Sequence, residues 1–208
     1  MQAVIDITNS SIQTKRLILR PFNKEDLNDV HYLSSFSSLE ESDKLLNKFI
    51  KNKNVFALVL KETNKVIGSI SLGKLTPSIK QINDTELQGV NIDFSVSKDH
   101  SNQGLATEAL KAIISHSFFS RHLDFLMCSH FEENIAVKRV IEKCGFKFYS
   151  IGEYKEYKTT NYILFNYYKR NNCHCELCLN PTTCLCKLCP NHDFCLINKP
   201  VSCKFKVN

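Results

Sequence analysis

The fold is decided by Ile92-Asp-Phe-Ser-Val-Ser97 and, after three more residues, by Ser101-Asn-Gln-Gly-Leu-Ala-Thr-Glu108. The first segment alternates apolar and polar residues, which is typical of a β-strand. From Leu105 onward, apolar pairs recur every four residues and predict a helix that begins at about Gly104. Together the two segments predict a strand that turns directly into the N-terminus of a helix.

Such a helix N-terminus is suited to bind a pyrophosphate. Its first amide groups have no partners within the helix, and they lie at the positive end of the helix dipole. Gly104 and Ala106 carry little or no side chain that would block the approach of a phosphate to the backbone. The alternative interpretation is a plain strand, turn and helix whose small residues pack against the sheet.

Periodicity in the rest of the chain predicts a mixed α/β fold with a twisted central sheet and about four helices. Asn23 and Ser38 are expected helix caps, because an acidic residue follows each of them three positions later. We expect helices at about residues 23–33, 38–50, 105–118 and 134–144, and strands at about residues 16–20, 55–60, 66–72, 89–97, 123–128, 146–151 and 162–168.

Length and composition are those of a globular protein. The chain has 208 residues, of which 43% are hydrophobic and 23% are charged, so it can bury a full core. No apolar run approaches the ~18 residues that span a bilayer, and residues 1–11 lack the features of a secretory signal. We therefore expect a cytosolic protein without a membrane partner. The net charge of +6 permits nucleic-acid binding but does not require it.

The cysteines divide the chain into two unlike parts. Eight of the ten lie between Cys173 and Cys203, and the preceding part of the chain holds only two. This change in composition predicts a main domain over residues 12–170 and a Cys-rich tail over residues 171–208.

The tail is expected to bind metal. Cys173-His-Cys-Glu-Leu-Cys178 and Cys184-Leu-Cys-Lys-Leu-Cys189 both read C-x-C-x-x-C, and in the reducing cytosol such close thiols favour metal over disulfides. Metal would also supply the fold of this small irregular segment. The alternatives are an iron–sulfur or copper site, disulfides, or a disordered thiol-rich tail, and His174 or His192 could replace individual cysteines. Two tetrahedral zinc sites would use all eight thiolates, from Cys173, Cys175, Cys178, Cys184, Cys186, Cys189, Cys195 and Cys203.

Four segments of the chain resemble, in the right order, the GNAT acetyltransferases, and among them the ribosomal-protein N-terminal (Rim-type) enzymes. The first is Thr14-Lys-Arg-Leu-Ile-Leu-Arg-Pro21, and the second places the coenzyme A signature (Arg/Gln)-x-x-Gly-x-(Gly/Ala) on Ser101 to Ala106. The third is Asn134-Ile-Ala-Val-Lys-Arg-Val-Ile-Glu-Lys-Cys-Gly-Phe146, and the fourth is Tyr162 to Tyr168. The resemblance covers roughly residues 12–169.

This resemblance implies a GNAT fold, whose sheet splays between its fourth and fifth strands where acetyl-coenzyme A enters. It also implies direct transfer of the acetyl group to an amine. Asn134 could instead be a simple helix cap, and Lys138 could lie on a solvated helix face. The implied coenzyme-binding residues are Phe94, Ser95 and Val96 for the pantetheine arm, Ser101, Asn102, Gln103, Gly104, Leu105, Ala106 and Thr107 for the pyrophosphate, Asn134 for the other side of the pantetheine, and Lys138 near the nucleotide's phosphates.

Two departures from the family pattern affect the expected chemistry. Ser101 and Asn102 stand where relatives have a basic residue or glutamine and the first glycine, so phosphate binding would rely on the backbone. Val137 and Ile141 leave the helix at 134–144 without a hydroxyl group that could protonate the departing thiolate. A free thiol has a pKa near ~8.5, so coenzyme A can still leave as the thiolate.

The candidate general bases are Asp93, on the strand beside the expected thioester, and His130, just beyond the fifth strand. Each of them could instead be a surface or loop residue. Cys128 and Cys144 could accept an acyl group, but we interpret them as small buried hydrophobic residues.

The acceptor is expected to be an amine of low pKa. At pH 7 a lysine side chain is only about 0.04% neutral, whereas an α-amine with a pKa near ~7.8 is more than ~10% neutral. The predicted activity is therefore acetyl transfer to a protein or peptide N-terminal α-amine, and the tail would help to recognise a ribosome-associated or other macromolecular substrate. One alternative is a catalytically weak adaptor that binds acyl-coenzyme A and contacts protein or nucleic acid through its tail. Another gives the tail the main role, in metal storage or nucleic-acid contact.

Overall fold

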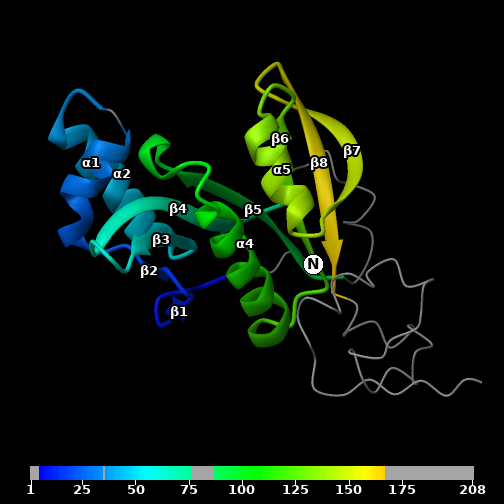
Figure 1. Ribbon diagram of the computed structural model, residues 1–208, viewed down its shortest axis with the longest axis horizontal. Coiled ribbons are helices and arrows are strands. Elements are labelled where there is room, and N and C mark those ends of the chain that lie inside the picture. The colour runs from blue at the N-terminus through cyan, green and yellow to red at the C-terminus, as the bar shows by residue number, and fades with distance from the viewer. Residues whose placement is uncertain (1–4, 35, 76–86, 167–208) are drawn as a thin grey trace, which may run out of the picture. The chain divides into compact units, whose positions relative to one another are not determined.

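The centre of the structure is a mixed β-sheet. The computed structural model describes residues 5–34, 36–75 and 87–166. Within them, eight strands are ordered β1-β2-β3-β4-β5-β6-β8-β7 (Figure 1). Neighbours from β1 to β5 pair antiparallel, as do β7 and β8, whereas β5 and β6 are parallel. The strands are β1 Ile12–Gln13, β2 Leu17–Pro21, β3 Val55–Leu60, β4 Lys65–Gly73, β5 Gly89–Val96, β6 Phe125–Phe131, β7 Lys147–Tyr154 and β8 Tyr157–Phe165.

The four expected α-helices are present in the described part of the chain. Asn23 forms a capping box at the short 3-10 turn that precedes the first helix, and the Ser38 hydroxyl accepts from the amide of Glu41 at 3.2 Å at the start of the second. The predicted α/β class and both caps are thus confirmed. The helices are α1 Leu27–Ser34, α2 Leu39–Asn52, α4 Leu105–Ser115 and α5 Ile135–Lys143.

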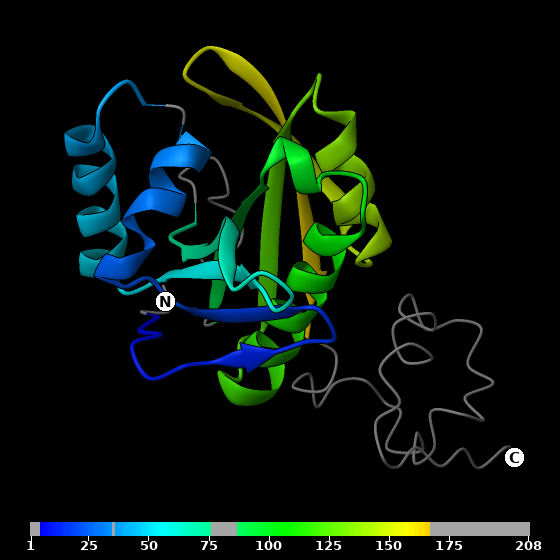
Figure 2. The same cartoon turned by 60° about the vertical axis from the view of Figure 1, so that its left-hand side comes forward.

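Helices cover both faces of the sheet (Figure 2). On one face, alternate residues of β3 form a core with Leu46 of α2 and with apolar residues of α1. On the other face, the fully buried Phe56 of β3 meets the ring of His116, at the end of α4, with 6.3 Å between ring centroids. This burial on two sides explains why the sequence of β3 is an unbroken apolar run.

The parallel strands β5 and β6 are tightly joined at one end and separate at the other. Gly89 packs against Phe125, because a Cβ at this glycine would lie 2.3 Å from the phenylalanine ring. The paired register then ends at Ile92 and Cys128, although both strands continue. Figure 1 shows β5 running obliquely away from β6. Because the short β1 was not predicted, β5 and β6 are the fourth and fifth predicted strands. The sheet is therefore splayed at the position that the resemblance implies.

Ile7, before the first residue of the predicted domain, is fully buried. The chain divides into two compact units after Leu164, and the predicted boundary at residue 170 lies outside the described residues. The predicted Cys-rich tail, residues 171–208, lies outside the described residues.

Candidate functional site

The N-terminus of α4 is formed by a turn with an unusual backbone. Gly104, the N-cap residue, has a φ angle of 77°, and Asn102 has a φ angle of 59°, both in the left-handed region that glycine and asparagine tolerate best. No side chain of the described residues caps this end, so the first amide groups of α4 have neither an intrahelical nor a side-chain partner. The turn presents backbone donors at the positive end of the helix.

Polar side chains of this turn stabilise the turn itself. The Ser101 hydroxyl donates to the carbonyl of Lys98, and the Gln103 side-chain amide donates to the carbonyl of Asp99 at 3.1 Å. Both side chains are thereby engaged, as is the amide of Ser101, which donates to the carbonyl of Lys98 at 3.2 Å. The backbone amides that the turn can present to a ligand therefore begin at Asn102.

Arg16, from the start of β2, joins this turn to the first strands of the sheet. Its Nε donates to Glu108 Oε2 at 2.8 Å, and its Nη1 donates to the carbonyl of Gln103 at 2.9 Å. The hydroxyl of Thr14 and the amide of Arg16 donate to Glu108 Oε1 at 2.6 and 2.8 Å. Desolvation alone would raise the pKa of Glu108, but these hydrogen bonds outweigh it and lower that pKa. The ion pair therefore fixes both the turn and the first turn of α4.

The edge of β5 that faces the splay has backbone groups that do not bond to β4. The amide of Ser97 donates to the carbonyl of Ile67 in β4 at 2.8 Å, and Ser95, two residues earlier, faces β4 in the same register. Backbone groups along an antiparallel pair point alternately to one side and the other. The backbone groups of Phe94 and Val96 therefore point away from β4, toward the edge that β6 has left.

A recess of about 470 Å³ lies between the diverging strands. Its walls come from the end of β4, from β5 and β6, from the start of α5 and from the β7/β8 hairpin. The lining residues are Lys74, Asn91, Ile92, Asp93, Phe94, Ser129, His130, Phe131, Asn134, Val137, Glu153, Tyr154, Thr159 and Asn161.

Asp93 is an acidic group in this recess with a perturbed pKa. Although its side chain is exposed, the surrounding walls desolvate it enough to raise its pKa, against the lowering effect of a hydrogen bond from Asn91. The Asn91 amide makes this bond at 3.0 Å, and Asn91 is only 5% exposed. Among the described residues, Asn91 Oδ1 has no partner. The recess thus contains a carboxyl group and a buried hydrogen-bond acceptor side by side.

His130 lies within β6 and is buried, so the expectation that it follows the strand was wrong. The strand extends beyond its apolar run, because the polar residues Ser129 and His130 at its end line the recess. The Nδ1 atom of His130 lies 2.7 Å from the carbonyl of Phe131, which requires a proton on Nδ1, and Nε2 has no partner among the described residues. In the neutral ring Nε2 is therefore a proton acceptor.

Comparison with known proteins identifies the family of this chain. Residues 16–147, more than half of the chain, match the family model described as the acetyltransferase (GNAT) domain. The chain belongs to the GNAT acetyltransferase family. It is also similar to the uncharacterized N-acetyltransferase YnaD of Bacillus subtilis, at 26% identity over 148 residues, which cover 65% of this chain and 82% of that protein. The chain is accordingly an N-acetyltransferase.

Solved structures share the GNAT fold with this chain. An acetyltransferase of the GNAT family from Bacillus anthracis matches with a TM-score of 0.64 and 21% identity, over 75% of this chain and 98% of that one. A putative ribosomal-protein-serine acetyltransferase from Vibrio cholerae matches with a TM-score of 0.63 and 16% identity, over 76% and 98%. RimL, a ribosomal L7/L12 α-N-protein acetyltransferase in complex with coenzyme A, matches with a TM-score of 0.60 and 15% identity, over 75% and 98%.

Helix α5 of the GNAT domain bears out one of the two interpretations of Asn134. Its side chain accepts from the amide of Val137 at 3.1 Å and caps the helix, while the residue also lines the recess. Val137 lines the recess as well, Ile141 is fully buried in the core, and Lys138 is partly exposed on the same helix. In the described part of the chain, α5 therefore offers the recess no hydroxyl group.

Several polar residues of the GNAT site escaped the sequence analysis. The Ser129 hydroxyl donates to Asn161 Oδ1 at 2.7 Å, and the Asn161 amide donates to the Ser150 hydroxyl at 3.1 Å. Together with Asn91 they form a polar wall on the otherwise apolar sheet. The sequence could have indicated them, because polar residues at alternate positions of β5 and β8 lie on one face of their strand.

Burial disfavours the thiolate form of both cysteines of the GNAT domain. Burial raises the pKa of the Cys128 thiol well above its usual value, and burial raises that of Cys144 to about 12. Both are buried and free, which agrees with the interpretation that they are small hydrophobic residues.

The described residues contain no metal-binding group of His, Cys, Asp or Glu, and the tail cysteines lie outside them. No helix in the described ranges is long and apolar enough to cross a membrane.

Proposed function

We propose that this GNAT domain transfers the acetyl group of acetyl-coenzyme A to the α-amine of a protein or peptide N-terminus. The observation that carries the proposal is the uncapped N-terminus of α4, which follows the strand that lines the recess after the short 3-10 helix Lys98–His100. The reaction needs a place for the phosphates, a strand edge for the pantetheine arm and a recess for the amine. The uncapped N-terminus of α4, the edge of β5 and the first recess support the proposal of these three roles.

In this proposal the backbone holds most of the donor. The amides of residues 102–107 bind the pyrophosphate, as expected at a helix N-terminus, whereas the amide of Ser101 already donates to the carbonyl of Lys98 at 3.2 Å. Phe94 and Val96 present their backbone groups to the pantetheine arm, which pairs with the strand edge as an added strand would. Ser95 contributes less, because its backbone faces β4. Asn134 bounds the other side of the arm, and Lys138 attracts the nucleotide's phosphates.

Acetyl transfer requires a base for the acceptor. The neutral amine attacks the carbonyl carbon of the thioester, the carbon–sulfur bond breaks with its electron pair on sulfur, and the amine loses a proton. We assign this proton to Asp93, because its carboxyl group lies open in the recess and its raised pKa brings it closer to the range of an efficient base. His130 is the alternative base, through Nε2.

The leaving thiolate needs no acid from α5. Val137 and Ile141 offer no proton, but a thiol is a far stronger acid than an alcohol, with a pKa near ~8.5 for a free cysteine, so coenzyme A can depart as the thiolate. The proposed acceptor follows from the same chemistry, since a site with few catalytic groups favours an amine that is already partly neutral. The names of the Vibrio cholerae protein and of RimL, which refer to ribosomal proteins, support an N-terminal acceptor on such a partner.

Radiolabelled acetyl-coenzyme A tests the proposal directly. One peptide would carry a free α-amine and no lysine, and a matched peptide would carry a blocked α-amine and one lysine. We expect the first to be labelled at least tenfold faster at pH 7, because its amine is far more often neutral. Equal rates, or a preference for the lysine, would contradict an α-amine acceptor.

A second candidate function is an adaptor that binds acyl-coenzyme A without turning it over. The absence of a hydroxyl group from the described recess wall of α5, at Val137, favours it. The same assay separates the two functions: a melting temperature that rises with acetyl-coenzyme A, with no label on any amine, would support the adaptor.

We further propose that the tail, residues 171–208, binds zinc through its eight cysteines and helps a cytosolic enzyme to recognise its macromolecular substrate. The repeated C-x-C-x-x-C spacing carries this proposal. Elemental analysis of the full-length protein, purified under reducing conditions, should find about two zinc ions per chain. Protein free of metal would contradict it.

A further inference from the structure

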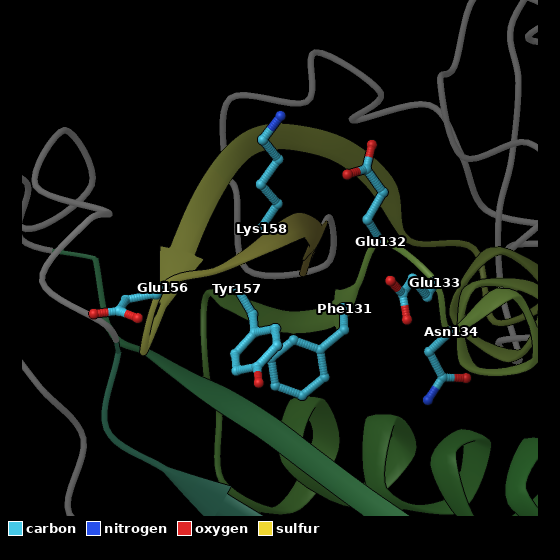
Figure 3. Close-up of a pocket in the computed structure, with 7 residues that line it drawn as sticks. All are labelled: Phe131, Glu132, Glu133, Asn134, Glu156, Tyr157 and Lys158. Atoms are coloured by element: carbon cyan, nitrogen blue, oxygen red, sulfur yellow. The ribbon is translucent and has the colours of Figure 1, made fainter.

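A second recess, of about 660 Å³, adjoins the first one. The two share Phe131 and Asn134 among their lining residues. The walls of the second recess come from the connection between β6 and α5 and from the turn between β7 and β8 (Figure 3). An acceptor held in the first recess can therefore extend into the second.

Three exposed aromatic rings lie together at this place. Phe131, Tyr154 and Tyr157 are 46%, 53% and 68% exposed. The ring of Phe131 lies 6.4 Å from that of Tyr154 and 5.9 Å from that of Tyr157, measured between centroids, and Figure 3 shows Phe131 and Tyr157 side by side. Aromatic faces attract cations. The cluster already holds one, because Lys155 Nζ lies 5.5 Å from the centroid of Tyr154.

The charges around the two recesses are mainly negative, although the whole chain has a net charge of +6. Figure 3 shows the ammonium group of Lys158 and the carboxylate of Glu132 both directed away from the rings of Phe131 and Tyr157, whereas the carboxylate of Glu133 is on the side of Asn134. A cationic group in the second recess would therefore meet both aromatic faces and carboxylates. The lining contains five acidic residues, Asp93, Glu132, Glu133, Glu153 and Glu156, and two lysines, Lys74 and Lys158, and Lys155, over the ring of Tyr154, adds a third cation beside it.

We propose that the second recess binds a second positive charge of the acceptor, located within about two residues of the amine that is acetylated. An extended residue spans about 3.3–3.6 Å, so a basic side chain at the second or third position of a peptide can reach a recess that shares lining residues with the first. This proposal rests on the proposed function, because the first recess must hold the reacting amine. The second charge adds binding without altering the chemistry, so it acts on KM rather than on kcat.

Peptides that differ at one residue test this proposal. Each would begin with serine and carry arginine, glutamine or glutamate at the second or third position, since arginine adds charge without another amine to acetylate. For wild-type protein at low ionic strength we expect kcat/KM to be about threefold to tenfold higher with arginine than with glutamine, through a lower KM, and lowest with glutamate. The preference should shrink in 0.5 M salt, because exposed charges are screened.

Variants locate the effect. The double variant E132Q/E133Q and the variant Tyr157→Leu should bring the arginine and glutamine peptides to nearly equal kcat/KM, whereas Glu62→Gln, on the distant β3/β4 turn, should keep the preference. Dependence on Glu132 and Glu133 with spermidine as well would extend the recess to small polyamines, and dependence with peptides alone would restrict it to N-termini. Equal kcat/KM for the peptides in the wild type, or a preference that survives both variants, would overturn the proposal.

Peptide binding in the presence of coenzyme A, measured by calorimetry, gives the same comparison without turnover. Absence of acetyl transfer to every peptide would contradict the proposed function. Tighter binding of the arginine peptides would still support the second recess, and equal binding would still overturn it.

Discussion

Asp93 occupies a wall of the recess where water is partly excluded, and this raises its pKa. A carboxyl group whose pKa is higher in the folded than in the unfolded chain stabilises the fold only when it is protonated. That contribution is complete below the unfolded pKa, near 3.8, and is lost as the pH rises through the folded pKa. At neutral pH the ionised Asp93 therefore costs stability, which is typical of a group kept for chemistry.

Substitution Asp93→Asn should separate chemistry from stability. We expect kcat to fall by about 10²–10⁴, while the melting temperature at pH 7 stays the same or rises. In the wild type, the acid side of the kcat/KM profile should reflect both the carboxyl group and the acceptor amine, and in the variant the amine alone. His130→Gln is the control. If His130→Gln changed the acid side of the kcat/KM profile and Asp93→Asn left it unchanged, the role of the base would pass to His130.

Single residues show where sequence patterns stop being informative. Asp93 could be predicted, because it lies on the strand that leads into the coenzyme A signature. Arg16 could not be connected to Glu108, although both belong to recognised motifs, because 92 positions separate them and only the folded sheet brings them to 2.8 Å. Asn91 was missed because a polar residue in a strand is usually exposed, whereas here it is buried beside Asp93.

At the scale of elements, periodicity predicted the four helices because each has a cap or an apolar stripe. The last hairpin was harder to predict, and β8 begins at Tyr157 rather than at the expected residue 162. Its turn places Lys155 and Glu156 at φ angles of 49° and 70°. Tight hairpin turns of this kind usually contain glycine or asparagine, and neither residue is present to mark the turn in the sequence.

The turn before α4 provides a test at this scale. Gly104→Ala has room for its methyl group, whose nearest neighbour would be Arg16 Nη2 at 3.6 Å, but it must adopt a φ angle of 77°. We expect the free energy of unfolding in urea to fall by about 1–2 kcal/mol and the KM for acetyl-coenzyme A to rise severalfold. Gly145→Ala, which must adopt a similar φ angle, of 89°, but lies after the C-terminal end of α5, is the matched control. A Gly104→Ala protein with unchanged KM would show that the donor does not use this turn.

At the scale of the whole molecule, the first recess depends on the arrangement of the sheet more than on any one motif. Gly89 lets β5 approach β6 at one end, and the twist of the sheet separates the same strands at the other, where the first recess opens. The sequence predicted the splay only through resemblance to a family. The recesses themselves could not be predicted, because their walls come from five separate segments that only the complete fold assembles.

The most direct test is a crystal structure of the full-length protein with acetyl-coenzyme A. We expect the pyrophosphate oxygens to accept hydrogen bonds from the backbone amides at the start of α4, around Gly104, with the thioester in the recess beside Asp93. A donor whose phosphates bind elsewhere, while these amides contact only solvent, would contradict the proposed site.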